Sequence, residues 1–393
     1  MSTIDRNGSE TVVVIGGGII GLASAYYLAQ RGAEVTVLEK SSTGAGNTGR
    51  ANGGIRAQFT SPVSSSLSKE SIAVWESFEE DFGVDIEYRR PGYLFLARTE
   101  STAEQFKENV SKQNELGIPS RFVSPQRAKE LCPELYHEQF VGGTYCPIDG
   151  MADPHLALQG FSEAARTSGV EIRTKTEVID VLQDESGAAV GVETQADTIT
   201  ADFVVNASGA WANEIGRMVG VDLPVHPKRR KLMVVEPQKP VSEDVPFTID
   251  SDLGVHFRPE REGSAVAGGH FNDDDPEKDP DNFSTSTSLE WAAEVIERGS
   301  QVAGYFGPET RVNRGWAGLY AVTPDHHPII EETIPGFVNA VGFSGHGFMQ
   351  SPATGQIVAE IITDGSPSLV DVSELTADRF ARGGYLKEGT VID

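Results

Sequence analysis

The sequence predicts an α/β protein that combines a domain built on a buried parallel sheet with an α+β domain built on a mainly antiparallel sheet. Three observations predict this fold. The chain begins with a strand, a glycine-rich turn, a helix and a second strand; a middle segment places strands in succession without helices; and the last third returns to a strand followed by a helix. A length of 393 residues suits about two or three domains.

The first pattern is a βαβ unit near the N-terminus. Residues Thr11–Ile15 (TVVVI) form a continuous apolar and β-branched run, as a strand buried on both faces requires. Residues Ile19–Arg31 carry apolar side chains at helical spacing, and Gly32 is expected to end this helix. Residues Val35–Leu38 then form a second buried strand.

A glycine fingerprint lies between the first strand and the helix. Residues 16–21 (GGGIIG) match G-x-G-x-x-G, in which Gly16 permits the tight turn, Gly18 lets the backbone approach a pyrophosphate and Gly21 allows close helix–strand packing. The helix N-terminus offers free N–H groups to phosphates. Glu39 ends the second strand, where its carboxylate accepts ribose hydroxyls and repels the 2′-phosphate of NADP. The domain is therefore predicted to be Rossmann-like and to bind a dinucleotide.

A second glycine-rich loop follows Glu39 and distinguishes between cofactors. Residues 44–56 (GAGNTGRANGGIR) are small apart from two arginines. NAD has little use for such a loop, whereas a longer cofactor lying across the strand ends needs close backbone contact at its second phosphate, ribityl chain and ring. The loop favours FAD over NAD, in a Rossmann-like domain of the glutathione-reductase type.

Further elements follow along the chain. Ser61-Pro62 opens a predicted helix, and Asp153-Pro154 opens another that ends at Gly169. Strands are expected at the ranges 170–173, 178–181, 203–205, 231–235, 254–258, 264–267 and 337–342. Residues 351–362 are expected to be a helix with Pro352 at its first position.

These elements predict that both domains are discontinuous in sequence. We expect an FAD-binding domain from residues 1–83, 143–223 and 311–393. The substrate domain is expected to be inserted as residues 84–142 and 224–310, the second of which contains the strands without intervening helices.

The composition is acidic, with 58 Asp and Glu against 32 Lys and Arg and a formal net charge of −26. One interpretation is a salt-rich cytosol that screens this self-repulsion; the other is an ordinary acidic enzyme. The stretch Asn272–Asn282 (NDDDPEKDPDN) fits a solvated surface. Either interpretation argues against nucleic acid and anionic membranes as partners.

No apolar run is long enough to predict a membrane span, and Met1–Glu10 has no apolar signal region. The only cysteines, Cys132 and Cys146, are too few for a disulfide framework or a zinc site. We therefore expect a cytoplasmic protein without a metal. A homo-oligomer or a hetero-oligomer is compatible with the sequence.

Seven motifs carry a resemblance to a known family, and they run through nearly the whole chain: GGGIIG (16–21), TGRANGGIRAQF (48–59), NASGAWA (206–212), PVHPKRR (224–230), HFRPE (256–260), GWAGLYAVTPDHHPII (315–330) and GFSGHGFMQSPATG (342–355). The chain resembles the D-amino-acid-oxidase-like flavoproteins. The nearest branch is similar to sarcosine oxidase β chains, L-proline dehydrogenases of the β type and glycine oxidase.

The resemblance implies a bound FAD and its contacts. The residues implied are Gly16, Gly18, Ile19, Gly21, Glu39, Lys40, Thr48, Gly49, Arg50, Gly53, Gly54, Val178, Ala207, Ser208, Gly209, Gly318, Gly342, Ser344, Gly345, His346, Gly347 and Phe348. Relatives that attach flavin covalently use a histidine or a cysteine where this chain has Arg50 and Gly318. Non-covalent FAD is therefore expected.

The resemblance also implies oxidation of the C–N bond of a small amino acid or secondary amine, such as sarcosine, proline or glycine, by hydride transfer to flavin N5 and hydrolysis of the imine. Arg56 matches a family arginine at the flavin edge, and its guanidinium suits a carboxylate. Glycine oxidases have an arginine where this chain has Tyr320, so Arg258 is a candidate replacement. His270 is a candidate base or a histidine bonded to the backbone, and His346 a structural residue of the flavin loop or a base.

Departures from the family pattern, and the range of functions on the same fold, leave alternatives open. Val266 stands where monomeric sarcosine oxidases have a lysine that promotes reaction with oxygen, which favours a dehydrogenase over an oxidase. A 2-hydroxy-acid oxidoreductase and a flavin-bearing assembly or structural subunit are the other functions considered. The pair His326-His327 resembles a metal site but lacks spaced partners, so a pair at the entry to a strand is expected instead.

Overall fold

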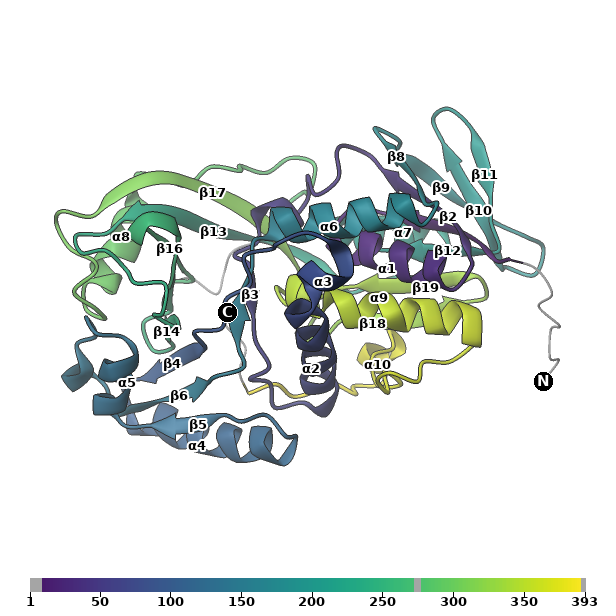
Figure 1. Cartoon of the computed structure of the whole chain (residues 1–393). Coiled ribbons are helices and arrows are strands. Elements are labelled where there is room, and N and C mark those ends of the chain that lie inside the picture. Colours follow the sequence, from purple (N-terminus) through teal and green to yellow (C-terminus); the bar gives the residue numbers. More distant parts are fainter. Residues whose placement is uncertain (1–8, 272–276, 390–393) are drawn as a thin grey trace.

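Two large sheets form the framework of the computed structural model, which describes residues 9–271 and 277–389 (Figure 1). The first sheet has six strands in the order β18-β19-β12-β1-β2-β8, and the second has eight in the order β17-β13-β16-β15-β14-β4-β6-β5. The strands of the first are parallel except at one edge, and those of the second are mainly antiparallel. The predicted fold class is confirmed.

The central strands of the six-stranded sheet, β1, β12 and β19, are buried on both faces. Its strands are β1 (Thr11–Ile15), β2 (Glu34–Glu39), β8 (Glu171–Thr174), β12 (Phe203–Asn206), β18 (Ile329–Ile334) and β19 (Phe337–Val341). Because strand side chains alternate, Val12 and Val14 join one apolar cluster whereas Val13 and Ile15 join another. A continuous apolar run is therefore what this position in the sheet requires.

Helices cover one face of this sheet: α1 (Ile19–Gln30), α2 (Pro62–Glu76), α3 (Phe78–Phe82), α6 (Pro154–Thr167) and α9 (Gly347–Asp364). A three-stranded sheet and a helix contribute to the core on the other face: β9 (Val178–Gln183), β10 (Ala189–Thr194), β11 (Thr198–Thr200) and α7 (Ala212–Met218). Helices α1 and α9 cross so closely that a Cβ at Gly355 would lie only 2.7 Å from the carbonyl carbon of Ala23.

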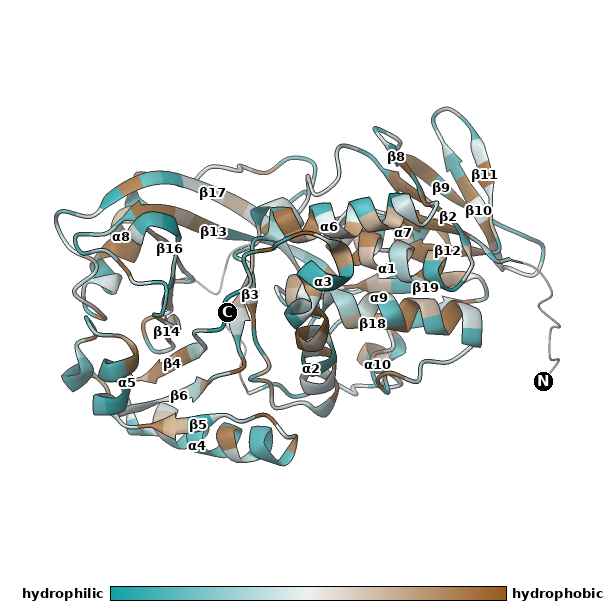
Figure 2. Ribbon diagram, viewed as in Figure 1, coloured by the Kyte–Doolittle hydropathy of each residue, from teal (hydrophilic) through white to brown (hydrophobic). Residues whose placement is uncertain are grey.

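The eight-stranded sheet contains β4 (Tyr93–Ala97), β5 (Arg121–Val123), β6 (Gly142–Cys146), β13 (His226–Glu236), β14 (Phe247–Asp250), β15 (Val255–Pro259), β16 (Ala265–Gly269) and β17 (Arg311–Val322). One face packs on α5 (Pro125–Leu131) and α8 (Leu289–Gly299), and α4 (Glu100–Glu115) packs beside Tyr93 and Phe95. Figure 2 shows hydrophobic residues concentrated in the strands and inner helices, with α4 largely hydrophilic outside. The remaining named elements are β3 (Gly54–Ile55), β7 (Gly150–Met151) and α10 (Asp378–Ala381).

The last long helix corrects one expectation. Helix α9 begins at Gly347, so Pro352 lies inside the helix and not at its first position. A proline there cannot donate to the carbonyl of Phe348. The hydroxyl of Ser351 donates to that carbonyl instead, at 2.9 Å, and so satisfies the acceptor that the proline leaves open.

Strand β17 was not anticipated as a strand. It pairs with β13 along its length, although residues 311–393 were assigned to the FAD-binding domain. Strand β6 likewise belongs to the eight-stranded sheet, although residues 143–223 were assigned to that same domain. The domain boundaries as given stay a prediction. Helices α4, α5 and α8 were also not expected.

Some expectations fall on residues that the structure does not describe. Residues 1–8 of the N-terminal segment and 272–276 of the acidic stretch lie outside the described ranges. Within those ranges, no helix has the length and apolar character needed to cross a membrane. Both cysteines are buried and unpaired with one another.

Candidate cofactor and substrate site

A cavity of about 860 Å³ lies where the two sheets meet. Residues that follow the carboxyl ends of β1, β2, β12 and β19 border it from one side, and residues of β13, β14, β15 and β17 border it from the other. The carboxyl edge of a parallel sheet is where α/β proteins bind ligands. The volume is in the range of ligand-binding cavities.

The first glycine turn brings backbone to the cavity at close quarters. Gly16 has a φ of +113°, and a Cβ there would lie 2.5 Å from the carbonyl oxygen of Ala207. A Cβ at Gly21 would lie 2.0 Å from the carbonyl oxygen of Gly16, so only glycine permits this approach of α1 to the turn. Gly21 itself does not border the cavity.

Two helices point uncapped N-termini at the cavity. The other long described helices carry a side-chain cap, from Ser61 in α2, Thr99 in α4, Asp153 in α6 and Ser288 in α8. Helices α1 and α9 begin after Gly18 and His346, with no side-chain cap bond at either. Both of these residues border the cavity. Their first turns therefore offer N–H groups and a partial positive charge to a bound acceptor.

The carboxylate of Glu39 is held at the end of β2. It accepts hydrogen bonds from the backbone N–H of Gly17, at 2.9 Å, and of Ser41, at 2.7 Å. The neighbouring Lys40 binds the carboxylate of Asp281 and lies 4.1 Å from the ring centroid of Trp211. Lys40, which was expected to contact the cofactor, thus also holds the segment around Asp281 at this end of the cavity.

The second glycine-rich loop lies across the middle of the cavity. The hydroxyl of Thr48 accepts a hydrogen bond from the backbone N–H of Ile19 at 3.1 Å, which joins this loop to α1. Arg50 donates to the carbonyls of Ala45 and Gly46, so its guanidinium stabilises the loop. Gly49 packs behind the lining, where a Cβ would lie 2.7 Å from the carbonyl oxygen of Gly44.

A third turn, residues 342–348, precedes helix α9. Ser344 and Gly345 both have positive φ angles, +50° and +91°. A Cβ at Gly345 would lie 2.4 Å from the ring of Tyr320, so glycine is required for this contact. The hydroxyl of Ser344 accepts from the N–H of Thr323 at 3.1 Å and holds the turn.

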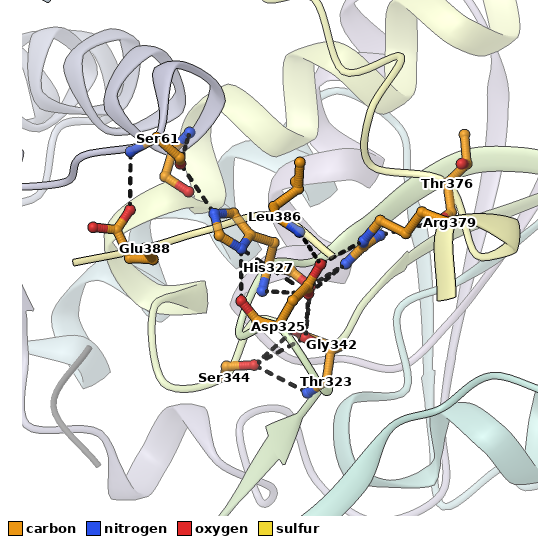
Figure 3. A network of polar contacts seen from close by, with 11 residues as sticks. Ser61, Thr323, Asp325, His327, Gly342, Ser344, Thr376, Arg379, Leu386 and Glu388 are labelled. Atoms are coloured by element: carbon orange, nitrogen blue, oxygen red, sulfur yellow. Dashed lines mark hydrogen bonds and ion pairs between the residues drawn. The ribbon is translucent and has the colours of Figure 1, made fainter. Parts of the chain in front are cut away.

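A buried polar network supports this third turn from behind (Figure 3). Arg379 donates to both carboxylate oxygens of Asp325, at 2.8 and 2.9 Å. His327 donates from Nδ1 to the carbonyl of Asp325 at 2.7 Å, so its Nε2 accepts from the hydroxyl of Ser61 at 3.0 Å. The C-terminal segment, the turn and the start of α2 are thereby joined.

His327 is thus a structural residue that lies two positions before β18. This position agrees with the expectation that the pair His326-His327 lies at the entry to a strand. Within the described residues 9–271 and 277–389, no group of three His, Cys, Asp or Glu side chains is placed to hold a metal ion.

Arg56 and His346 meet beside the third turn. Nη2 of Arg56 donates to Nε2 of His346 at 3.2 Å, and Nη1 donates to the carbonyl of Gln58 at 2.7 Å. The guanidinium lies 4.0 Å from the ring centroid of Phe59. Burial lowers the pKa of Arg56, which is 1% exposed, and lowers that of His346 well below its usual value. An arginine nevertheless stays charged, whereas this histidine stays neutral.

Asp149 anchors the loop that carries Arg56. Its carboxylate accepts from the backbone N–H of Ala57 at 2.6 Å and from the side-chain amide of Gln58 at 2.9 Å. Burial raises its pKa to about 6 despite these hydrogen bonds and the nearby Arg56. The loop that carries Arg56 is therefore anchored by a carboxyl group that titrates near neutral pH.

A row of rings closes the cavity on the side of the eight-stranded sheet. Ring centroids are 4.4 Å apart for Tyr93 and Phe247, 5.6 Å for Phe247 and His256, 5.8 Å for His256 and His270, and 6.4 Å for His270 and Tyr320. Burial lowers the pKa of His256 to about 4, and it lowers that of His270 well below its usual value. Both rings are neutral near pH 7.

The structure brings together most of the residues predicted for the site. All the predicted cofactor and substrate residues border the cavity except Gly21, Gly49 and Arg258. Arg258 lies one step behind: its Nε donates to the carbonyl and side-chain oxygens of Asn52, and it pairs with Glu260 at 2.9 Å. It holds the second glycine loop, which corrects its assignment as a residue facing the substrate.

Val266 also differs from expectation. It is buried in β16 and does not border the cavity, so the residue on which weak oxygen reactivity was predicted has no contact with the site. Conversely, Tyr93, Phe247, His256, Arg230 and Trp211 border the cavity and were not predicted. The motifs PVHPKRR and HFRPE contain Arg230 and His256, but nothing local to either motif distinguishes the side chain that faces a ligand.

The chain matches a family model described as FAD dependent oxidoreductase (DAO) over residues 11–361. The chain belongs to this family of FAD-dependent oxidoreductases. The crystal structure of L-proline dehydrogenase from P. horikoshii is 34% identical and superimposes with a TM-score of 0.87, covering 95% of this chain and 98% of that one. Glycine oxidase from Geobacillus kaustophilus is 26% identical, with a TM-score of 0.83 and coverage of 94% and 99%.

Longer proteins also contain this fold. Mitochondrial dimethylglycine dehydrogenase of Rattus norvegicus is 27% identical over 96% of this chain. The match spans only 45% of that relative, so the chain is about half its length.

The cavity fits the FAD that the family is described as using. Gly16, Gly53 and Gly345 leave no room for a Cβ, and the N-termini of α1 and α9 offer N–H donors of the kind that bind phosphates. Glu39 lies where a ribose is expected relative to the first turn. Donors and acceptors of these kinds match a dinucleotide that carries a flat, electron-accepting ring.

The buried titratable groups predict how stability depends on pH. Unfolding restores His256 to a pKa of about 6.5, so the unfolded state binds more protons than the folded state between pH 6.5 and 4. The free energy of unfolding therefore decreases as the pH is lowered through that window. A shift from 6.5 to about 4 corresponds to about 3 kcal/mol. Asp149 has the opposite sign, because its raised pKa stabilises the fold at low pH and this contribution is lost as pH rises through about 6.

We therefore expect His256→Gln to flatten the decline in stability below pH 6.5 and Asp149→Asn to steepen it. Urea unfolding followed by circular dichroism between pH 7 and pH 4.5, at constant ionic strength, measures both slopes. Parallel curves for the two variants and the unsubstituted protein would contradict the assignment.

Proposed function

We propose that this protein oxidises the C–N bond of a small amino acid or secondary amine with non-covalently bound FAD. The observation that carries the proposal is the placement of Arg56 beside His346, at the start of α9 and at the end of the cavity lined by rings. A charged guanidinium in an enclosure lined by aromatic rings and neutral histidines suits a substrate carboxylate. The names of the similar proteins, among them L-proline dehydrogenase and glycine oxidase, support the same class of substrate.

Each group has a separate role in this proposal. Arg56 binds and orients the carboxylate, and its own position is held by the carbonyl of Gln58 and by His346. The rings of Tyr93, Phe247 and Tyr320 exclude water, so that the reacting C–H is held by packing. His270 borders the cavity and is neutral, so its ring can accept a hydrogen bond from the substrate nitrogen. Its lowered pKa opposes uptake of the proton itself.

FAD, when bound, accepts a hydride from the carbon next to nitrogen, and the imine that leaves the site hydrolyses in water. The chain contributes the environment for this cofactor. The N-terminus of α9 begins at the third turn, and its partial positive charge stabilises negative charge on a bound ring. The positions used for covalent attachment in relatives hold Arg50, which binds loop carbonyls, and Gly318.

Anaerobic mixing of the purified holoenzyme with panels of amino acids, N-methyl amino acids and 2-hydroxy acids tests the reaction. We expect the visible flavin absorption to bleach with an amino acid or secondary amine. Bleaching by 2-hydroxy acids alone would assign the alternative oxidoreductase, and no bleaching by any panel would favour a flavin-bearing structural subunit. Either of these results would overturn the proposal.

Replacement of Arg56 tests the carboxylate anchor. Since a hydrogen bond to a charged group contributes roughly 1.5–3 kcal/mol, Arg56→Ala should raise KM by about 10- to 100-fold while flavin stays bound. Arg56→Met keeps the length of the buried side chain and separates loss of charge from loss of packing. Arg173→Ala, which removes a surface ion pair with Glu171 and Asp197, is the control and should leave KM unchanged. Equal kinetics in all variants would remove Arg56 from the substrate site.

The mode of FAD attachment has a direct measurement. Because neither Arg50 nor Gly318 can form the bonds that histidine or cysteine form in relatives, acid precipitation should release all of the yellow colour into the supernatant. Colour that remains in the washed pellet would show a covalent bond.

A further inference from the structure

Arg230 is a cation of the cavity that the proposed reaction does not use. It lies on β13 opposite Gly318 of β17 and borders the cavity. Its Nε is buried and has no hydrogen-bond partner among the described residues, and its one hydrogen bond is a long one, 3.3 Å, from Nη1 to the carbonyl of Arg229. A guanidinium carries five N–H donors. Most N–H donors of Arg230 therefore have no hydrogen-bond partner among the described residues.

The guanidinium lies at the ring-lined end of the cavity. Its central carbon is 5.8 Å from the ring centroid of Tyr320, and its charge contributes to the lowered pKa of His270. The adjacent Lys231 also borders the cavity, but its ammonium lies 5.6 Å from the ring of Trp291 in helix α8. Both cations act on His270, and Arg230 is the one whose guanidinium lies near Tyr320.

The acidic residues that border the cavity come from segments other than β13. Glu39 ends β2, Glu177 precedes β9, Glu214 belongs to α7, and Asp281 is bound to Lys40. Within the described part of the chain, no carboxylate pairs with Arg230. A partly buried charge without a counter-ion is costly, and an anionic ligand removes that cost.

Arg56 and Arg230 reach the cavity from different walls. Arg56 follows β3 in the second glycine loop and lies against Phe59 and His346, whereas Arg230 comes from the eight-stranded sheet and lies near His270 and Tyr320. Both guanidinium groups therefore border the same ring-lined cavity, which neutral histidines also border. Two separately mounted arginines suit a ligand with two anionic groups better than one with a single carboxylate.

We propose that Arg230 binds a second carboxylate of the substrate, so that the substrate is a dicarboxylic amino acid or an N-substituted amino acid with two carboxylates. Arg56 holds the carboxylate next to the reacting carbon, and Arg230 holds the other. This inference rests on the proposed oxidation of amino acids, because it assigns specificity within that same site.

Binding of unreactive carboxylates to the FAD-containing enzyme tests the second anchor independently of catalysis. Succinate and glutarate are compared with butyrate and pentanoate, which have the same chain lengths and one carboxylate. Ligand binding is followed by the change in flavin absorption. We expect the dicarboxylates to bind about 10- to 100-fold more tightly than the monocarboxylates, and Arg230→Gln to abolish this difference.

Arg229→Gln is the matched control. It removes the same charge one residue away, where the guanidinium is bound to the carbonyls of Ser284 and Ser286 and does not border the cavity. This variant should keep the preference for dicarboxylates. Arg230→Lys keeps the charge but loses the planar guanidinium that binds a carboxylate through two N–H groups, so it should show an intermediate preference for dicarboxylates. FAD content and thermal unfolding of each variant establish that the fold is intact.

The outcomes separate this inference from the proposed function. Reduction of the flavin by aspartate or glutamate in preference to asparagine or glutamine, lost in Arg230→Gln, supports it. No preference for dicarboxylates in the unsubstituted enzyme overturns it, as does an equal loss of both ligand classes in Arg230→Gln, which places Arg230 on the same carboxylate as Arg56. If no amino acid reduces the flavin, the proposed function fails, whatever the carboxylate binding shows.

Discussion

The close approach of backbone to backbone at the start of α1 is the constraint on which the site depends. Gly16, Gly21 and Ala207 meet at distances that exclude any added side chain, which brings the end of β1 and the first turn of α1 together. The N–H of Ile19 donates to the hydroxyl of Thr48, and Gly18 before the helix has no side chain to cap it, so the rest of the first turn keeps N–H donors at the cavity. Helix α9 repeats the arrangement at the far end, after the turn at Gly345. Both helix starts therefore leave N–H donors available at the cavity.

The third turn is held by charge and hydrogen bonds from behind. A buried pair of Asp325 and Arg379 seldom adds net stability, because both groups lose their hydration. Here it fixes a geometry, since the same carboxylate and the neighbouring His327 connect the C-terminal segment to Ser61 and the turn (Figure 3). The strained Ser344 persists within that frame, and it positions His346 and the start of α9.

The charge of the site is opposite to that of the molecule. The chain has a net charge of −26, yet Arg56 and Arg230 place positive charge at the ring-lined end of the cavity. Burial keeps His256, His270 and His346 neutral, so Arg56, Arg230 and the nearby Lys231 determine this local charge near pH 7. Recognition of an anionic group is therefore a property of the enclosed site, where water does not screen the interaction.

Local patterns were enough to predict the parallel sheet, the glycine turns and the edge of the sheet at which the cavity lies. The reason is that the backbone requirements of a turn or a buried strand determine which residues can occupy neighbouring positions. Pro352 shows the limit of such patterns, since the hydroxyl of Ser351 allows a proline inside α9. The wall of the substrate cavity was beyond them. Tyr93, Phe247, His256 and Arg230 come together only through the register of the eight-stranded sheet. Arg258 lies two residues after His256 on the same strand, yet it binds Asn52 and Glu260 and does not border the cavity. Long-range strand pairing decides which side chains share a cavity, and no neighbouring residue records it.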